Sequence, residues 1–315
     1  AGEGSCLRVC GMLLRALLGA VIVATATSFA LNAPHVALAP RLATPPRTLP
    51  RQACSTRRSG LLMTTGKNLE RGKEMAVKLN KEGTEQRLNM LEAQLIRDLE
   101  EAVKTYHDPV FTTALIAGDD VILHVIHKAG LLDKIKVIFI DTMHLFPETY
   151  DFLDRVEKHY GFKAKVYKPS GVETKDEFDE KYSDDLFVED VEEYDKVAKV
   201  EPLLRGLKES GTWLWINGRR RDHGFERAAI QVWEDDKMNP IAYWSFQDCW
   251  DYIRARGVPY HSLHDEGYPS LGDMHSTLRV DKDKWFLHGM ERAGRFQNIQ
   301  NKDGSDKTEC GIHTI

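Results

Sequence analysis

The chain has 315 residues, of which 29% are charged and 42% hydrophobic, as in a soluble globular protein of one large or two modest domains. Seven arginines against one acidic residue give residues 1–60 a charge of +6, so the net charge of −5 leaves −11 for residues 61–315. An acidic body of this kind argues against general nucleic-acid binding, and its two cysteines, Cys249 and Cys310, provide no disulfide framework.

Residues 1–60 predict a targeting leader. An arginine precedes the apolar run 16–31, which is short for a membrane span, contains Ser and Thr, and ends in small residues, as in a signal peptide. The stretch after it is rich in Arg, Pro, Ser and Thr, as in a transit peptide. Together they indicate a plastid reached through the secretory route, with a mature form that is not membrane-bound. The alternative is a single membrane anchor with a disordered linker.

Strands and helices alternate in the body. Residues 61–106 predict a helical extension of one or two helices, from apolar residues at helical spacing. Strands are predicted over 110–116, 136–142, 164–169 and 212–218, and helices over 119–130, 147–161, 200–210 and 245–257. Ser245 and Asp248 begin the last helix in a capping-box pattern. After Tyr260 the periodicity is weak, and loops are expected.

This alternation predicts a doubly wound α/β fold with a mostly parallel sheet and a loop-rich C-terminal tail. Ligands of such sheets bind beyond the carboxyl ends of the strands. Three polar segments follow predicted strand ends: TTALIAGDD, DTMHLFPET and GRRRDHGFER. We therefore expect these segments to meet at one edge of the sheet and to form the site.

The segment GRRRDHGFER predicts an anion site. It holds Arg219, Arg220, Arg221 and Arg227, and guanidinium groups bind phosphate and sulfate oxygens through two parallel hydrogen bonds. A solvated basic turn is the alternative, but the acidic body and the preceding buried strand favour the anion site. The segment TTALIAGDD has one Gly and no Lys, so it is no Walker loop and only weakly indicates phosphate binding.

The segment TECGIH places Cys310 three residues before His313 and shortly after Arg292 and Arg295. Nearby cations or an imidazole favour the nucleophilic thiolate form of a cysteine. The alternative is a disordered tail with an idle cysteine, because one Cys near one His is a weak signal. Cys249 lies in a predicted amphipathic helix and is interpreted as a buried structural thiol. The histidine spacing matches no standard zinc pattern, so no metal is expected.

The motifs that carry a family resemblance follow one another along the chain: DTMHLFPETY, KVEPL, GRRR…R, PYHSLHDEGYPSLGD and ECGIH. Through these motifs, which keep the order of the family, the sequence resembles the 3′-phosphoadenylylsulfate (PAPS) and adenylylsulfate (APS) reductase family. The resemblance covers residues 85–315. It implies a Rossmann-like fold of the adenine-nucleotide α-hydrolase type, with a nucleotide-binding reductase domain over 107–290 and a mobile catalytic tail over 291–315. The lead prediction is thioredoxin-dependent reduction of PAPS to sulfite in sulfate assimilation.

The resemblance also implies residue roles. Cys310 would attack the sulfur of the activated sulfate and form an S-sulfonate, from which thioredoxin or a glutaredoxin-like dithiol releases sulfite. His313 would orient the tail or support the thiolate. The substrate-binding residues implied by the motifs are Thr112, Thr113, Asp141, Thr142, Lys199, Arg220, Arg221, Arg227, Arg292 and Arg295. The arginines would offset the charge of the nucleotide before a thiolate approaches.

One branch of this family holds a four-iron four-sulfur cluster on two cysteine pairs. The corresponding residues here are Tyr194, Asp195, Asp273 and Ser276. Their side chains do not replace four thiolates, so neither a cluster nor any other bound cofactor is expected. Cluster-free members typically use PAPS, which makes PAPS the lead substrate and APS the nearest alternative.

Two other classes of function stay open. An ATP-using adenylyl-transfer enzyme of the related fold usually has an SGG-x-DS loop, which this sequence lacks. A non-catalytic nucleotide-binding or redox-regulatory protein would bind nucleotide without forming sulfite. No fused thioredoxin-like domain is evident, so we expect a separate reductant, no nucleic-acid partner, and a homodimer as the default assembly.

Overall fold

The structure, a computed structural model, describes residues 58–313. The targeting leader predicted over 1–60 lies almost entirely outside the described residues. Ser59–Ile315 form one compact unit. Between residues 58 and 313, no helix is both long enough and apolar enough to cross a membrane.

Six strands form a single sheet in the order β3-β2-β1-β4-β6-β5. They are β1 (Val110–Thr113), β2 (Lys136–Ile140), β3 (Lys165–Tyr167), β4 (Trp215–Ile216), β5 (Trp233–Glu234) and β6 (Lys237–Met238). All neighbours pair in parallel except β5 and β6, which form an antiparallel edge hairpin. The predicted doubly wound, mostly parallel sheet is confirmed. Its strand order reverses between β1 and β4, which is where ligands bind in such folds.

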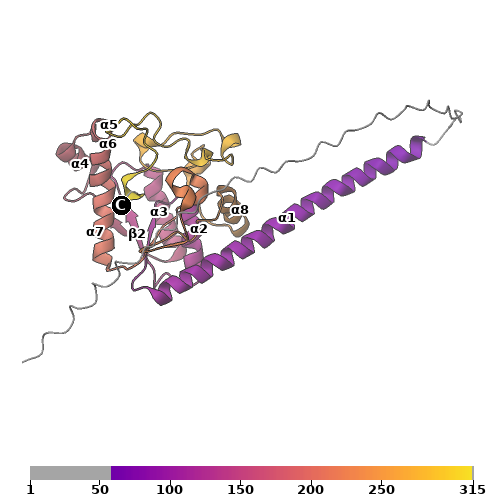
Figure 1. Cartoon of the computed structure of the whole chain (residues 1–315), viewed down its shortest axis with the longest axis horizontal. Coiled ribbons are helices and arrows are strands. Elements are labelled where there is room, and N and C mark those ends of the chain that lie inside the picture. The colour runs from indigo at the N-terminus through magenta and orange to yellow at the C-terminus, as the bar shows by residue number, and fades with distance from the viewer. Residues whose placement is uncertain (1–57, 314–315) are drawn as a thin grey trace, which may run out of the picture. The chain divides into compact units, whose positions relative to one another are not determined.

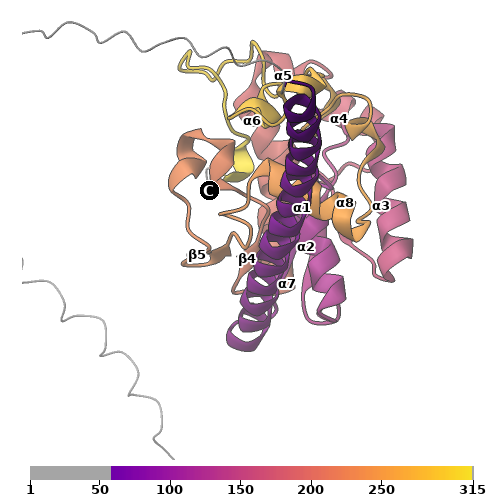
Figure 2. The same cartoon turned by 90° about the vertical axis from the view of Figure 1, so that its right-hand side faces the viewer.

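Helices cover both faces of the sheet (Figures 1 and 2). The longer ones are α1 (Arg58–Thr105), α2 (Ala117–Lys128), α3 (Pro147–Tyr160), α7 (Glu201–Ser210) and α8 (Phe246–Arg256). Helix α7 packs against β2 and β3, whereas α2 packs against α8. The predicted capping box of α8 is present, because Ser245 and Asp248 each bond to the backbone of the other.

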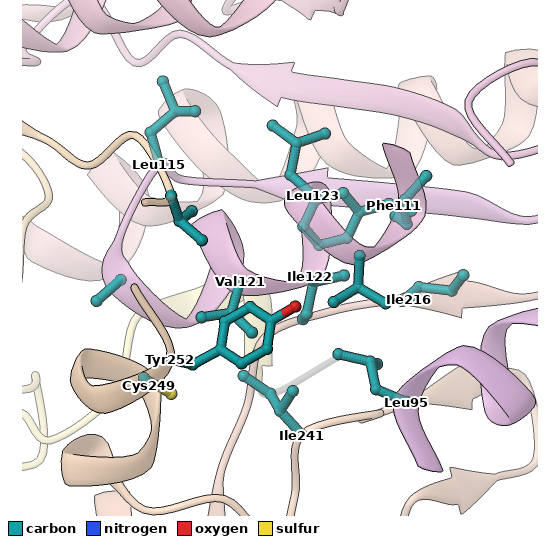
Figure 3. Packing of buried hydrophobic residues seen from close by; sticks show 14 of the residues in the cluster. Leu95, Phe111, Leu115, Val121, Ile122, Leu123, Ile216, Ile241, Cys249 and Tyr252 are labelled. Atoms are coloured by element: carbon teal, nitrogen blue, oxygen red, sulfur yellow. The ribbon is translucent and has the colours of Figure 1, made fainter. Parts of the chain in front are cut away.

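The core lies mainly between the sheet and the layer of α1, α2, α3 and α8. Successive side chains of β1 point to opposite faces of the sheet, as expected for a strand. Phe111 packs in this large core, whereas Val110 packs in a small one that includes Ile138 and Tyr167. Figure 3 shows Phe111 beside Ile122 of α2, with Tyr252 of α8 below them. Both faces of the strands are therefore apolar, which explains the continuous hydrophobic runs in the sequence.

Helix α1 is one helix of 48 residues. Its second half packs on the core through Leu88, Leu95, Leu99 and Ala102, which are at most 1% exposed. Residues 69–87 are all exposed. Packing against the core therefore begins at Leu88, and the exposed residues 69–87 take no part in it.

The strands end earlier than the apolar runs suggest. The strand predicted over 110–116 ends at Thr113, because the chain turns there: Leu115 takes a positive φ of 56°, and Asp119 accepts a hydrogen bond from the Ala114 amide. This early turn brings the hydroxyls of Thr112 and Thr113 to the edge of the sheet.

Several short elements were not predicted. The acidic stretch after β3 holds α4 (Lys175–Tyr182), α5 (Leu186–Glu189), α6 (Val191–Asp195) and a π-helical turn (Lys196–Val200). The hairpin of β5 and β6 was also missed, because strands of two residues show no alternation. After α8 the described chain holds only short 3₁₀ turns, which confirms the predicted loop-rich segment.

Candidate active site

The candidate site is a pocket beyond the carboxyl ends of β1, β2 and β4. Most predicted site residues line it: Thr112, Thr113, Thr142, Lys199, Arg227, Arg292, Arg295, Cys310 and His313. Its free volume is about 170 Å³, whereas small-molecule pockets usually exceed about 300 Å³. The tail residues Cys310, Ile312 and His313 form part of its wall. In this closed arrangement the tail takes up space that a nucleotide needs.

The turn after β1 presents hydroxyl groups. The Thr113 hydroxyl accepts a hydrogen bond from the Leu115 amide at 3.0 Å, and the Thr112 hydroxyl accepts one from the Trp215 indole at 2.7 Å. Asp119, in the first turn of α2, is buried, and burial raises its pKa to about 7 even though it accepts a backbone hydrogen bond. The carboxyl group therefore repels an anion less than an ordinary aspartate would.

The two polar residues after β2 have different roles. The Thr142 hydroxyl lines the pocket and donates to Asp273 at 2.5 Å. Asp141 accepts hydrogen bonds from the Met143 amide at 2.9 Å and the Tyr150 hydroxyl at 2.7 Å, and it is not part of the pocket wall. The carboxylate of Asp141 therefore holds the turn after β2 in this state, and its role in substrate binding stays a prediction.

Lys199 extends into the pocket wall from the π-helical turn. Its ammonium group lies 2.7 Å from Asp195 and 2.8 Å from Asp273, and all three side chains are buried. Burial opposes the charge of Lys199, but Asp273 and Asp195 outweigh it and raise the pKa of the lysine. Burial would likewise raise the pKa of Asp273, but Lys199 lowers it to about 2. These groups are therefore ionised together at neutral pH.

Of the three arginines after β4, only Arg219 lines the pocket. Its Nε donates to the side-chain oxygens of Asn217 at 3.1 Å and Asn239 at 3.0 Å, and one terminal nitrogen lies 2.7 Å from Glu234. Arg219 belongs to the arginine run for which an anion site was predicted, but it was not among the substrate ligands implied by the family resemblance. The sequence signal for it was the same run of arginines, without any indication of which one faces the pocket.

Arg220 and Arg221 lie outside the pocket wall, so the pocket does not support their predicted role as substrate ligands, which stays a prediction. Arg220 is 0% exposed and forms ion pairs with Asp222 at 2.9 Å and with Glu291. Arg221 donates to a backbone carbonyl at 2.7 Å and lies over the ring of Tyr243. The backbone at Arg220 is extended, with φ −131° and ψ 154°, so consecutive side chains point in different directions.

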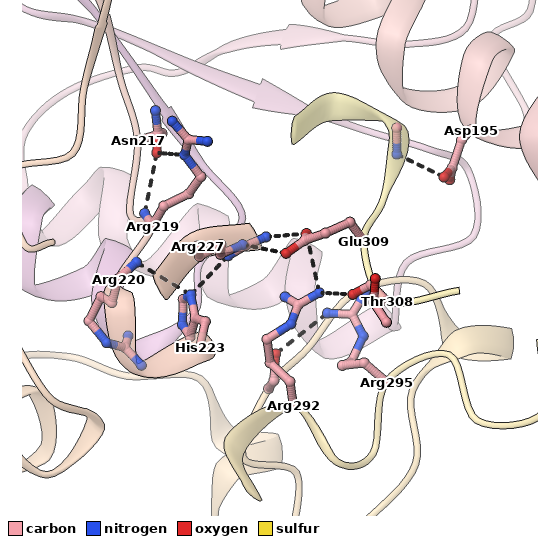
Figure 4. Close-up of polar contacts among 12 residues, drawn as sticks. Asp195, Asn217, Arg219, Arg220, His223, Arg227, Arg292, Arg295, Thr308 and Glu309 are labelled. Atoms are coloured by element: carbon pink, nitrogen blue, oxygen red, sulfur yellow. Dashed lines mark hydrogen bonds and ion pairs between the residues drawn. The ribbon is translucent and has the colours of Figure 1, made fainter. Parts of the chain in front are cut away.

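Arg227 and Arg292 hold a carboxylate of the tail. Arg227 donates to both oxygens of Glu309, at 2.6 and 2.5 Å, and Arg292 donates to the Thr308 carbonyl at 3.0 Å (Figure 4). Burial, added to the nearby charge of Arg227, lowers the pKa of Arg292 to about 10. In this state the two arginines bind the acid that directly precedes Cys310.

Arg295 approaches the pocket from the same segment as Arg292. It donates to the Leu271 carbonyl at 2.6 Å, while its buried Nε has no partner among the described residues. Lys199, Arg292 and Arg295 all lie close enough to interact electrostatically with Cys310, which is partly exposed. Cys310 therefore lies among three cations.

His313 is stacked on Trp215, with ring centroids 6.2 Å apart and an interplanar angle of 4°. Burial, with the charges of Arg227 and Arg219, holds the pKa of His313 well below its ordinary value. The imidazole is therefore neutral at pH 7 and adds no positive charge beside Cys310. The stacking instead fixes the end of the tail against β4.

The four positions that carry cluster cysteines in one branch of the resembled family lie around Lys199. Asp195 and Asp273 both bind its ammonium group, and the ring of Tyr194 lies 5.0 Å from it. Ser276 donates to the backbone carbonyl of Asp273. These carboxylate, phenol and hydroxyl groups do not fit the thiolate donor set of an iron–sulfur cluster.

Sequence reasoning missed several groups that shape the site. They are Asn217, Glu309, and the carboxylates Asp195 and Asp273 in their role as partners of Lys199. Glu309 could have been found, because an acid next to Cys310 has opposite charge to the predicted arginines. Asp195 and Asp273 both pair with Lys199, although they lie 78 positions apart in the sequence. No local sequence pattern indicates that they meet.

The fold and this site define a nucleotide-binding type of α/β protein, with an arginine-rich anion site and a cysteine beside it at the switch point of the sheet. Residues 108–279 match the family described as "Phosphoadenosine phosphosulfate reductase domain". The chain belongs to this family. The matched residues include Lys199 and Arg227 but end before the tail that carries Cys310.

Three relatives extend the comparison. The phosphoadenosine phosphosulfate reductase of Emericella nidulans is 39% identical over 210 residues, which cover 64% of this chain and 65% of that protein. The adenosine 5′-phosphosulfate reductase of Staphylococcus haemolyticus is 33% identical, covering 68% of this chain and 85% of that protein. A crystal structure of PAPS reductase from Candida auris, a phosphate complex, is 36% identical with a TM-score of 0.53, covering 61% of this chain and 97% of that one.

Proposed function

We propose that this protein reduces PAPS to sulfite and adenosine 3′,5′-bisphosphate, with thioredoxin or a similar dithiol as the reductant. The observation that carries the proposal is the position of Cys310 in a pocket lined by Lys199, Arg227, Arg292 and Arg295. A sulfated nucleotide carries several negative charges, and these cations would offset them while a thiolate approaches.

The proposed reaction has two steps. The Cys310 thiolate attacks the sulfur of the activated sulfate, an S–S bond forms, and the sulfur–oxygen bond to the nucleotide phosphate breaks with its electron pair on the departing nucleotide. A thiolate of the reductant then attacks the sulfur atom of Cys310, and sulfite leaves. A second thiol of the reductant resolves the mixed disulfide, which returns the Cys310 thiol and leaves the reductant oxidised.

The tail must move during this cycle. With Glu309 on Arg227, the pocket has about 170 Å³ of free volume, which is less than a nucleotide-sized ligand requires. We infer that substrate binding displaces Glu309 from the arginines, and that the tail closes again with Cys310 over the sulfate. Opening after the first step would then expose the S-sulfonate to the reductant.

We propose PAPS rather than APS because the residues around Lys199 do not fit a cluster, and we propose that no cofactor is bound. APS reduction is the second candidate, since a relative of comparable coverage is named for that substrate. We also propose that the protein acts in plastid sulfate assimilation, on the basis of the leader sequence. We propose a homodimer because dimers are the commonest assemblies of soluble oligomers.

The experiment is sulfite release by the purified protein with thioredoxin, given PAPS or APS in separate reactions. Faster release from PAPS is expected, and faster release from APS would keep the chemistry and reverse the substrate assignment. Cys310→Ser should abolish sulfite release. Cys249→Ser is the matched control, because burial raises the pKa of the Cys249 thiol to about 12 and keeps it inert. Pyrophosphate release from ATP without sulfite would support the adenylyl-transfer alternative.

A further inference from the structure

The tail is fastened on both sides of Cys310 by one carboxylate. Asp195 Oδ2 accepts a hydrogen bond from the backbone amide of Gly311 at 2.8 Å and lies 2.8 Å from the Lys307 ammonium group. Figure 4 shows Asp195, at the end of α6, bonded to the backbone of the tail. Lys307 precedes Cys310 by three residues and Gly311 follows it directly, so the cysteine lies between the two contacts.

The anchor itself is held firmly. The other oxygen of Asp195 accepts from Lys199 at 2.7 Å, and Lys199 is held in turn by Asp273. The Asp195 and Lys307 side chains are 3% and 5% exposed. Burial would raise the pKa of Asp195, but the charges of Lys199 and Lys307 outweigh it and lower the pKa, so the carboxylate is ionised. Hydrogen bonds to charged groups with little access to water are among the stronger ones in proteins.

The backbone of the tail fits closely at this point. A Cβ atom added to Gly311 would lie 3.1 Å from Asp195 Cβ and 3.1 Å from Val200 Cγ2. Any larger residue would push the tail away from the π-helical turn. The glycine after Cys310 and the carboxylate opposite it therefore serve the same contact.

The contact of the tail through Glu309 must be broken when substrate binds. Glu309 is held by Arg227, a cation that the proposed substrate needs. The contacts of Asp195 use neither Arg227 nor Arg292 nor Arg295, so they can persist when the anion site is filled.

We propose that Asp195 is a positioning residue, which seats Cys310 over the substrate by holding the tail at Lys307 and Gly311. The inference rests on the proposed function and deepens it. In this chain a carboxylate stands where the cluster-binding branch of the family has a cysteine, and it serves to close the tail.

The test uses Asp195→Asn and Lys307→Met. Lys302→Met is the matched control, because Lys302 forms a 2.7 Å ion pair with Asp190 from the same tail segment, but its side chain is 60% exposed. The first readout is hydrogen–deuterium exchange of the tail peptide without any substrate. Both test variants should exchange faster by about ten- to a hundredfold, the effect of losing a hydrogen bond to a charged group. The control should change little, because exposed ion pairs contribute little.

The second readout is sulfite formation. Lys307→Met should lower kcat about tenfold or more with KM almost unchanged, because Lys307 contacts none of the cations that line the pocket. Asp195→Asn should lower kcat at least as much, and KM can change as well because Asp195 is also the partner of Lys199. The double variant should be no worse than Asp195→Asn alone, since the ion pair with Lys307 is already lost in that variant. The proposal is overturned if the tail peptide exchanges at the wild-type rate in both variants. It is also overturned if the tail exchanges faster but kcat does not change. If the wild-type protein forms no sulfite, the function fails, while the exchange rates still decide whether Asp195 holds the tail.

Discussion

Replacing Arg220 by Met should unfold the protein more easily without weakening substrate binding. Arg220 is completely buried and pairs with Glu291, whose side chain is 8% exposed. Removing one partner of such a pair leaves an uncompensated buried charge, which costs about 3–5 kcal/mol. For a protein of this size that lowers Tm by roughly 6–20 °C, at about 2–4 °C per kcal/mol.

The assay is urea unfolding followed by tryptophan fluorescence, together with KM for the nucleotide. Adding Glu291→Gln to Arg220→Met should restore part of the lost stability, because the unpaired charge is removed. Arg221→Met is the matched control, since Arg221 gives up a ring contact worth about 1 kcal/mol or less and one hydrogen bond to a backbone carbonyl, but leaves no buried charge unpaired. If Arg220→Met unfolds like the wild type and instead raises KM severalfold, Arg220 binds substrate and the structural assignment is refuted.

Three further results are expected. Gly218→Ala should lower the free energy of unfolding in urea by about 1–3 kcal/mol, because its Cβ would lie 2.1 Å from Asp119 Oδ1; full stability would contradict this. Glu309→Gln should bind adenosine 3′,5′-bisphosphate about tenfold more tightly in calorimetry, since it removes the carboxylate that competes for Arg227; weaker binding would show that Glu309 assists the ligand. Burial lowers the pKa of His264 to about 4, so the unfolded state binds one more proton between about pH 6.5 and 4, and stability falls on acidification. In His264→Gln that loss should be smaller by up to about 1.4 kcal/mol per pH unit, and an unchanged slope would contradict it.

The sheet could be predicted because its strands are buried on both faces and stand out as apolar runs. Their ends were harder to place. The run 110–116 stays apolar through Leu115 and Ile116, yet the chain turns after Thr113 because a carboxylate from α2 captures the next amide. Such a contact forms only when the helix is in place, so the spacing of hydrophobic residues does not record it.

The site was predictable in its chemistry and not in its individual ligands. Arginines after β4 and a cysteine in the tail were expected together, and the pocket contains both. Which arginine faces the pocket depends on the extended backbone at Arg220 and on buried acids such as Glu291, which is distant in sequence. The partners of Lys199 likewise come from separate segments, so their pairing follows from the tertiary fold.

The first half of α1 has a consequence for heat denaturation. Residues 69–84 lie exposed and include Gly72 and Gly83, which have no neighbours within 4 Å of an added Cβ. Contacts with α8 begin only at Glu85, which pairs with Arg256. Each glycine weakens a helix by about 1 kcal/mol relative to alanine, and helices without tertiary contacts are marginal in water. This half should melt as an independent helix–coil equilibrium, giving a gradual loss of ellipticity before the cooperative transition of the core. The amount of helix lost in the cooperative calorimetric transition would then be smaller than the total helix content measured by far-ultraviolet circular dichroism at low temperature.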